Sequence, residues 1–443
     1  MCAEAFRSLL RWLAPALLLA APALAQAGVQ IEHWQSASGA RVYFVENHGL
    51  PILDISVEFA AGSGADTADK SGLAGITQHM IGLGAEGLDE DRISKSFADV
   101  GAVFGGRFDT DRAGVTLRTL SSERERRQAL DTFTRVLQQP TFPESVLDRE
   151  KARIIAALKE ADTKPESIAD RAFERLLYGS HPYGLRGSGE VDTVPALQRE
   201  DLVRFYQGRY TRGQAVVAIM GDVSRKEAEA IAESLTRGLP EGGPVPPLPK
   251  VVAPQKAQAE RISHPASQAH ILIGYTGMTR DDPDYFPLWV GNYALGGGGF
   301  VSRLTEEVRQ KRGLAYSVYS YFIPLEQPGP FQIGLQTKKE QADEALKVVR
   351  ETLDGFIARG ITEKELKAAK DNIVGGFPLR IDSNKKILEY LAMIGYYRLP
   401  LTYLDDFIGK VEKVTASQIR EAFQRRIRTG DLVTVVVGAA DSK

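Results

Sequence analysis

Three residues with helical spacing mark a place where a zinc ion could bind. In the pattern H-x-x-E-H, two histidines one helical turn apart hold the metal, and the glutamate between them takes a proton from the bound water. Residues 72–80 read GLAGITQHM and put Gly75, Gln78 and His79 at these three positions. Glycine offers no ligand atom, and a glutamine amide does not accept a proton at neutral pH. The segment is therefore predicted to be a helix that keeps the spacing of a metal site but only one histidine.

The letters around these positions resemble GLAHFLEHM, the form of this segment in the family of pitrilysin, insulin-degrading enzyme and mitochondrial processing peptidase. In that family a glutamate on a later helix, of the form E-R-x-x-x-x-x-E, is the third zinc ligand. The matching helix here puts Glu150 at the first acid and Ala157 at the ligand position, with Glu160 as the nearest substitute. The resemblance implies that this chain binds no zinc of its own, and His79 alone is interpreted as a partly buried helical histidine.

Other hydrolytic patterns are missing from the sequence. The remaining histidines form no H-E-x-x-H or H-x-x-x-H pair, no G-x-S-x-G stretch occurs, and the single cysteine is Cys2. A standalone hydrolase would need an atypical site around His79. That alternative, including a vestigial metal at His79, is one that metal analysis of the pure protein decides.

Residues 1–27 have the features of a secretory signal peptide. Two arginines precede an apolar run at 12–21, and small residues at 23–25, or alternatively at 25–27, offer a cleavage site. The apolar run is shorter than the roughly 20 residues that a membrane span requires, so a retained anchor is the weaker alternative. The mature chain is expected to be periplasmic or secreted and to have no membrane segment.

Composition limits the partners of the mature chain. Over the full sequence of 443 residues, lysine and arginine number 55 against 57 aspartates and glutamates. A balanced charge argues against nucleic acid or anionic lipid as the main partner. The remaining length suffices for two domains of ordinary size with substantial cores.

The mature sequence contains a repeat. Residues 201–221 align without a gap on 418–438, and 144–154 resemble 363–373. Both copies of the first pair read as a helix, a turn and an apolar strand. We therefore predict an N-terminal domain at 28–237, an extended Pro- and Gly-rich linker at 238–257 and a C-terminal domain at 258–443.

The order of the expected elements indicates the α+β class. In each half two strands follow one another, at 41–46 and 53–60 and again at 315–322 and 329–336, and long amphipathic helices come later, at 122–138 and 341–359. This order favours a largely antiparallel sheet with helices on one face, formed twice. The family resemblance implies the same two tandem α/β sandwich domains, together forming half of a clam-shell.

The second half carries a pair of residues that could stabilise a transition state. Arg309 is expected in the last turn of a helix, Gly313 in the left-handed position that ends it, and Tyr316 at the start of a strand. In family members whose halves face a shared chamber, an Arg-x6-Tyr pair at this point hydrogen-bonds the substrate backbone and the oxyanion. The resemblance assigns this role to Arg309 and Tyr316. The alternative is an arginine in a surface ion pair and a tyrosine that caps the core.

A glycine-rich stretch lies just before this pair. It is not a phosphate loop, since neither a Lys-Ser/Thr pair nor a strand and helix of the required kind flank it. It resembles a short form of the glycine-rich loop in the non-catalytic subunit of the mitochondrial processing peptidase, which implies substrate binding by Gly296, Gly297, Gly298, Gly299 and Phe300. A flexible connection between helices is the alternative.

The two halves differ in what they retain, and this difference indicates a function. The metal positions are disabled, whereas the residues that would stabilise a transition state are intact. The sequence therefore predicts a non-catalytic subunit of a heterodimeric zinc metallo-endopeptidase, inactive alone and without a cofactor, that completes the site of a zinc-bearing homologous partner acting on peptides. A non-proteolytic interaction subunit of the same fold is the principal alternative.

Overall fold

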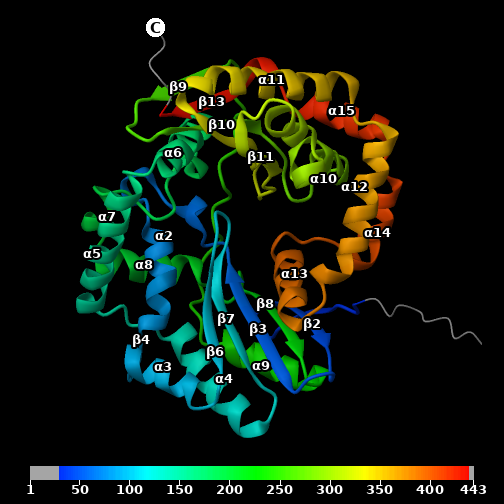
Figure 1. The fold of residues 1–443 in the computed structure, drawn as a ribbon. Coiled ribbons are helices and arrows are strands. Elements are labelled where there is room, and N and C mark those ends of the chain that lie inside the picture. Colours follow the sequence, from blue (N-terminus) through cyan, green and yellow to red (C-terminus); the bar gives the residue numbers. More distant parts are fainter. Residues whose placement is uncertain (1–28, 439–443) are drawn as a thin grey trace, which may run out of the picture. The chain divides into compact units, whose positions relative to one another are not determined.

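The computed structural model describes residues 29–438 (Figure 1). The expected signal peptide at 1–27 lies outside the described residues. From Ile31 onward the described residues belong to one compact unit, which contains two large open sheets surrounded by helices. This confirms the mixed helix-and-sheet class predicted from the order of the elements. Within the described residues no helix is both long enough and apolar enough to cross a membrane.

The first sheet is built from the N-terminal half. Its strands lie in the order β1 (Glu32–Gln35), β2 (Arg41–Glu46), β8 (Val216–Gly221), β3 (Ile52–Phe59), β7 (Ala113–Leu120) and β6 (Val103–Phe108). Neighbouring strands are antiparallel, except that β2 and β8 run parallel. Every residue of β8 is buried, as expected for an apolar strand that is covered on both faces.

The second sheet repeats this arrangement in the C-terminal half. Its order is β11 (Ala315–Phe322), β12 (Pro330–Lys338), β10 (Gln268–Thr276), β13 (Val433–Val437) and β9 (Gln258–Ile262). Again one outer pair, β13 and β9, is parallel and all other pairs are antiparallel. Without β1, the first sheet has the same order and the same strand directions, so the repeat in the sequence is matched by a repeat in topology. A short hairpin joins β4 (Gly84–Ala85) to β5 (Leu88–Asp89).

Helices occupy both predicted amphipathic stretches, at 122–138 and 341–359, and many further segments of the two halves. The N-terminal half contains α2 (Leu73–Met80), α3 (Glu90–Ala98), α4 (Glu123–Gln138), α5 (Glu144–Ala161), α6 (Pro165–Tyr178), α7 (Thr193–Ala196), α8 (Arg199–Arg209) and α9 (Arg225–Thr236). The C-terminal half contains α10 (Tyr285–Asn292), α11 (Ala342–Arg359), α12 (Glu363–Gly376), α13 (Asn384–Tyr396), α14 (Tyr403–Lys413) and α15 (Ala416–Arg426). Reciprocal capping boxes at Ser224, Thr362 and Thr415 satisfy free N–H groups where α9, α12 and α15 begin.

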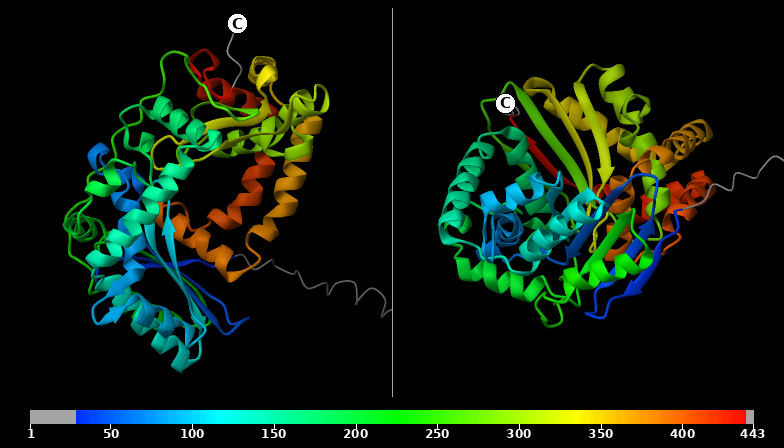
Figure 2. Two further views of the ribbon diagram at one scale, coloured as in Figure 1. Left: turned by 60° about the vertical axis from the view of Figure 1, so that its left-hand side comes forward. Right: turned by 90° about the horizontal axis from the view of Figure 1, so that it is seen from below.

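One helix of each half packs on the sheet of the other half. Helix α6 packs on β10 and β13 of the second sheet, and α13 packs on β2, β3 and β8 of the first (Figures 1 and 2). Both contacts are close: a Cβ atom on Gly274 would lie 2.6 Å from the Phe173 ring, and one on Gly395 would lie 2.6 Å from the Tyr43 ring. We predicted helices on one face of each sheet, and these two exchanged helices cover the other face.

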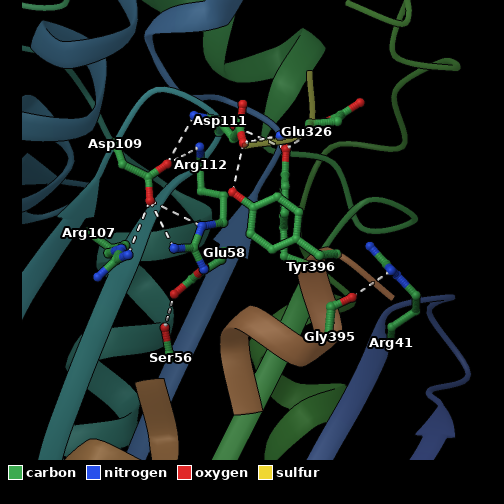
Figure 3. A network of polar contacts seen from close by, with 11 residues as sticks. Arg41, Ser56, Glu58, Arg107, Asp109, Asp111, Arg112, Glu326, Gly395 and Tyr396 are labelled. Atoms are coloured by element: carbon green, nitrogen blue, oxygen red, sulfur yellow. Dashed lines mark hydrogen bonds and ion pairs between the residues drawn. The ribbon is translucent and has the colours of Figure 1, made fainter. Parts of the chain in front are cut away.

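A polar network joins the two halves beside these helices. Asp111, in the turn between β6 and β7, accepts hydrogen bonds from the hydroxyls of Tyr183 and Tyr397 and, at 2.8 Å, from the backbone N–H of Glu326. The hydroxyl of Tyr396 donates to the carbonyl of Asp111 at 3.0 Å (Figure 3). One turn of the first half is therefore bound to two elements of the second.

The segment between α9 and β9 contains no helix or strand, in agreement with its Pro- and Gly-rich composition. It nevertheless contacts both halves. The ring of His181 lies 2.9 Å from the carbonyl oxygen of Pro249, and the hydroxyl of Tyr275 donates to the carbonyl of Pro254 at 3.1 Å. These contacts hold the segment against the surface of the protein.

Candidate functional site

Helix α2 forms where the weakened metal pattern was recognised. Gly72 takes the left-handed conformation (φ +94°) directly before the helix, a backbone state that glycine adopts without strain. The carboxylate of Asp66 accepts the N–H groups of Gly72 and Ala74, each at 2.8 Å, and so satisfies donors that a helix start leaves unpaired. Burial raises the pKa of Asp66 to about 7 although these two hydrogen bonds oppose the shift.

His79 contacts a carboxylate on the neighbouring helix. Its Nε2 atom lies 3.1 Å from Oε2 of Glu150 on α5, and the histidine side chain is 52% exposed, so it is more open than the partly buried residue that we predicted. Glu150 also accepts hydrogen bonds from Arg149 (2.7 Å) and Arg153 (3.0 Å). Burial favours the neutral acid, but the bonds from Arg149 and His79 outweigh it and lower the pKa of Glu150. The carboxylate therefore stays ionised and holds the imidazole.

The two altered positions on α2 contribute to packing. A Cβ atom on Gly75 would lie 2.9 Å from the carbonyl oxygen of Gly187, so a larger residue there would displace backbone. The side-chain amide of Gln78 donates to the carbonyl of Gly114 on β7 at 3.1 Å. Ala157 is exposed on α5, seven residues and hence about two turns beyond Glu150.

These residues do not fit a zinc ion. A zinc site takes three or four protein ligands, and at the three matching positions only His79 carries a ligand atom. Nowhere in residues 29–438 do three His, Cys, Asp or Glu side chains gather closely enough to hold a metal. The imidazole of His79 is instead in hydrogen-bond contact with Glu150.

The local structure around Arg309 agrees with the sequence prediction. A π-helical turn, Thr305–Gln310, carries Arg309 near its end, and Gly313 follows with φ +62°. Strand β11 then begins at Ala315, one residue before Tyr316. Because π-helical turns occur often at functional sites, this irregularity is consistent with a binding role.

Arg309 lies between two exposed aromatic rings. Its guanidinium carbon is 4.7 Å from the ring centroid of Tyr316 and 4.9 Å from that of Phe300, distances typical of cation–π contacts. Phe300 is 70% exposed and Tyr316 is 82% exposed. Among the described residues no carboxylate makes an ion pair with Arg309. The cluster Phe300–Arg309–Tyr316, which we call the aromatic–arginine cluster, presents guanidinium and phenol donors to solvent.

The glycines before Phe300 have separate local roles. A second π-helical segment, Tyr293–Gly297, is followed by a short turn, Gly299–Val301. A Cβ atom on Gly296 would lie 2.4 Å from Oγ of Ser320, so this glycine lets the segment approach β11 closely. Gly299 has φ +59°. These contacts explain Gly296 and Gly299 by packing and backbone conformation, and the predicted binding of substrate by the glycine stretch stays a prediction.

Sequence reasoning did not pair His79 with Glu150. The two residues are 71 positions apart, and the spacing within α2 carries no information about α5. The only available signal was that Glu150 matched the first acid of the expected helix. The aromatic–arginine cluster was expected in part, since Arg309, Tyr316 and Phe300 were all singled out but their mutual contact was not.

Comparisons with known proteins match both halves. The model for insulinase (peptidase family M16) matches residues 41–186, and the model for the peptidase M16 inactive domain matches residues 196–373. A crystal structure of a peptidase M16 inactive domain from Pseudomonas fluorescens is 36% identical, with a TM-score of 0.90, and the match covers 93% of this chain and 99% of that one. The crystal structure of a Helicobacter pylori protease, 19% identical with a TM-score of 0.85 over 93% and 99% of the two chains, shares the fold.

Two relatives of known sequence match over most of their length. The Bacillus subtilis protein named uncharacterized zinc protease YmxG is 24% identical over 92% of this chain and 98% of its own. The Helicobacter pylori protein named non-peptidase homolog YmxG is 24% identical over 89% and 91%. With two family models matching in succession and a relative 36% identical across nearly the whole chain, the protein belongs to the insulinase peptidase family M16.

Proposed function

We propose that the protein is a non-catalytic, periplasmic subunit of a heterodimeric zinc metallo-endopeptidase. In this assembly a homologous partner with an intact H-x-x-E-H motif would supply the metal and the general base. The present chain would supply the aromatic–arginine cluster, which binds the peptide and donates hydrogen bonds to the oxyanion that develops on the scissile carbonyl.

The observation that carries this proposal is the contrast between the two halves. In the first half Gly75 and Gln78 are committed to packing, and His79 is paired with Glu150. In the second half Arg309 has no carboxylate partner among the described residues, and its flanking rings are open to solvent. Guanidinium and phenol groups in this state are free to bind a substrate or a transition state, whereas the described residues of the first half offer no set of three metal ligands.

A rival proposal rests on the same surface. Phe300, Val301 and Tyr316 are all more than half exposed, and such an apolar group also suits a plain protein–protein interface. The name of the Helicobacter pylori relative, non-peptidase homolog, favours this reading. In that case the chain would be an interaction subunit without a role in proteolysis.

The test requires the assembled complex. We expect the mature chain to form a 1:1 complex with a zinc-bearing relative on co-expression, and to show no peptidase activity alone. In the intact complex, Arg309→Ala and Tyr316→Phe should lower kcat by about 100-fold, roughly 3 kcal/mol, because donors aimed at an oxyanion act mainly in the transition state. Arg312→Ala and Tyr319→Phe, on the same turn and strand, are matched controls that should retain kcat.

The outcomes separate the two proposals. A loss confined to KM would mean that the cluster only holds the peptide. Full kcat and KM for both variants, in complexes with unchanged zinc content, would refute the catalytic contribution and favour the interaction subunit. Two proteins that remain separate in size-exclusion chromatography at micromolar concentration would remove the basis for a shared site.

A further inference from the structure

A cavity of about 390 Å³ lies where the two halves and the connecting segment meet. The first half contributes the start of β2, the ends of β3 and α8 and the turn between β6 and β7. The second half contributes the loop before α10, the turn between β11 and β12 and the end of α13, and residues 245–248 pass beside it. This volume is within the range of pockets that bind small molecules, which often lie between domains.

Four arginines line the cavity without carboxylate partners. Within the described residues none of them makes an ion pair: Arg41, Arg209, Arg280 and Arg398. Arg41 donates instead to the carbonyl of Gly395 at 2.8 Å (Figure 3). Burial, and to a smaller extent the charge of Arg398, lowers the pKa of Arg41. The Nε atom of Arg280 is buried and has no hydrogen-bond partner. The cavity wall therefore carries guanidinium groups whose charge is not balanced by direct contact.

The second copy of the repeat shows what these arginines lack. Arg426 matches Arg209 in the repeat, and it bonds Asp282 at 2.7 Å and Asp284 at 2.9 Å. In the first copy, Asp66 lies after β3 in the way that Asp282 lies after β10 in the second copy. Both carboxylate oxygens of Asp66, however, accept backbone N–H groups at the start of α2. Arg209 is left with a long contact of 3.4 Å to a backbone carbonyl. The same arginine is neutralised in one copy and faces a cavity in the other.

The carboxylates in the cavity wall bind other donors. Asp111 accepts from two tyrosines and a backbone N–H, Glu326 accepts from Tyr396 at 3.2 Å, and Asp281 accepts from Thr279 at 2.8 Å. Burial raises the pKa of Asp111 and of Glu326. Arg398 has φ +53°, a left-handed conformation that costs a non-glycine residue free energy and that concentrates at functional sites.

We propose that this cavity binds a small oxyanion, a phosphate or carboxylate group, through Arg41, Arg209 and Arg398. A guanidinium offers paired N–H donors that match two oxygens of such a group, and these charge-assisted hydrogen bonds are strong when partly buried. An anion would neutralise the crowded charges and would bridge the two halves at their junction. The site is separate from the aromatic–arginine cluster and does not depend on peptidase activity.

Calorimetric titration and thermal unfolding of the full mature chain test this proposal. Inorganic pyrophosphate is one arm and citrate is the other, each against potassium chloride at equal ionic strength. Wild-type protein should bind at least one of the two anions, and its unfolding temperature should rise as the concentration of that anion rises. Arg209→Gln and Arg398→Gln should each weaken binding about tenfold or more, whereas Arg127→Gln, on the exposed face of α4, should not.

Stability without the anion provides an independent readout. Arg398→Gln should unfold close to the wild-type temperature, because it removes both the repulsion with Arg41 and the attraction to Glu326 and breaks no ion pair within the described residues. A lower unfolding temperature would give Arg398 a structural role and overturn its assignment as a ligand.

Binding by pyrophosphate alone or by citrate alone would identify the oxyanion as phosphate or carboxylate. Absence of binding for both at millimolar concentration, or affinities unaffected by both cavity substitutions, would overturn the site.

Discussion

The residue at position 75 must be small because neighbouring backbone leaves no room for a side chain. The carbonyl oxygen of Gly187 would lie only 2.9 Å from a Cβ atom placed on Gly75, which is too close for a side chain. Gln78 likewise holds a carbonyl of β7 through its amide N–H. At both positions the surrounding structure is adapted to the residue that is present.

This adaptation predicts that the zinc motif cannot be restored by substitution. The triple variant Gly75→His, Gln78→Glu, Ala157→Glu should bind no stoichiometric zinc and should lose at least about 1 kcal/mol of stability, because the new Cβ displaces backbone and the new carboxylate faces a carbonyl. Elemental analysis and thermal unfolding measure both effects. Ala157→Glu alone, on an exposed helix face, is the control and should leave stability unchanged. One zinc per chain at wild-type stability would contradict the prediction.

At the scale of elements, helix α2 depends on the carboxyl group that caps it. The pKa of Asp66 is raised from its ordinary value near 4 to about 7, so between these two values the folded state binds a proton that the unfolded chain releases. Stability from this group is therefore greatest at low pH and falls as pH rises from 4 to 7.

The variant Asp66→Asn tests this linkage. Because its amide does not titrate, the part of the pH dependence between pH 4 and 7 that comes from Asp66 should disappear, a contribution of at most about 4 kcal/mol. Chemical denaturation at several pH values measures the difference between variant and wild type. Parallel stability profiles for the two proteins across this range would show that Asp66 does not titrate there.

The exchanged helix α13 offers a second prediction at this scale. Gly395 faces Tyr43 and Val216 of the first sheet, and a Cβ atom would lie 2.6 Å from each. Gly395→Ala should therefore cost about 1–3 kcal/mol by overpacking. Gly409→Ala, in α14 where a Cβ atom meets nothing within 4 Å, is the matched control and should gain roughly 0.5–1 kcal/mol from helix propensity. Equal effects at the two positions would contradict the close packing of α13.

At the scale of the whole molecule, the exchange of α6 and α13 makes the halves interdependent. Each large sheet has one face covered by a helix that comes from the other half, and the Asp111 network lies beside this contact. An isolated half would retain a helix without its sheet and would expose the uncovered face of its own sheet to water.

Residues 28–257 and 258–443, expressed separately, should therefore fail to show a cooperative thermal transition. When the two fragments are co-expressed, they should associate and show a cooperative thermal transition, because each exchanged helix can then pack on the sheet of the other half. Circular dichroism and size-exclusion chromatography distinguish these states. A cooperative transition of either fragment alone would mean that the halves fold independently.

The sequence alone determined the local elements and the loss of the metal ligands. Strands 41–46 and 315–322 were identified from patterns of apolar residues, because the period of such a pattern is set by the element itself. The helix over residues 72–80 was predicted from the spacing of the metal-site pattern. Gly75 and Gln78 remove one ligand and the general base of the H-x-x-E-H pattern, since neither side chain can perform these roles. Gly313 was recognised as a helix end because its backbone conformation favours glycine.

Only the tertiary structure decided which distant residues meet. The pairing of His79 with Glu150 and the exchange of α6 and α13 depend on packing between elements far apart in the chain. The placement of Arg309 between Phe300 and Tyr316 depends on how three neighbouring segments fold against one another. The arginines of the cavity come from both halves and carry no shared pattern. Local periodicity reports which face of an element is buried, and it does not report which other element covers that face.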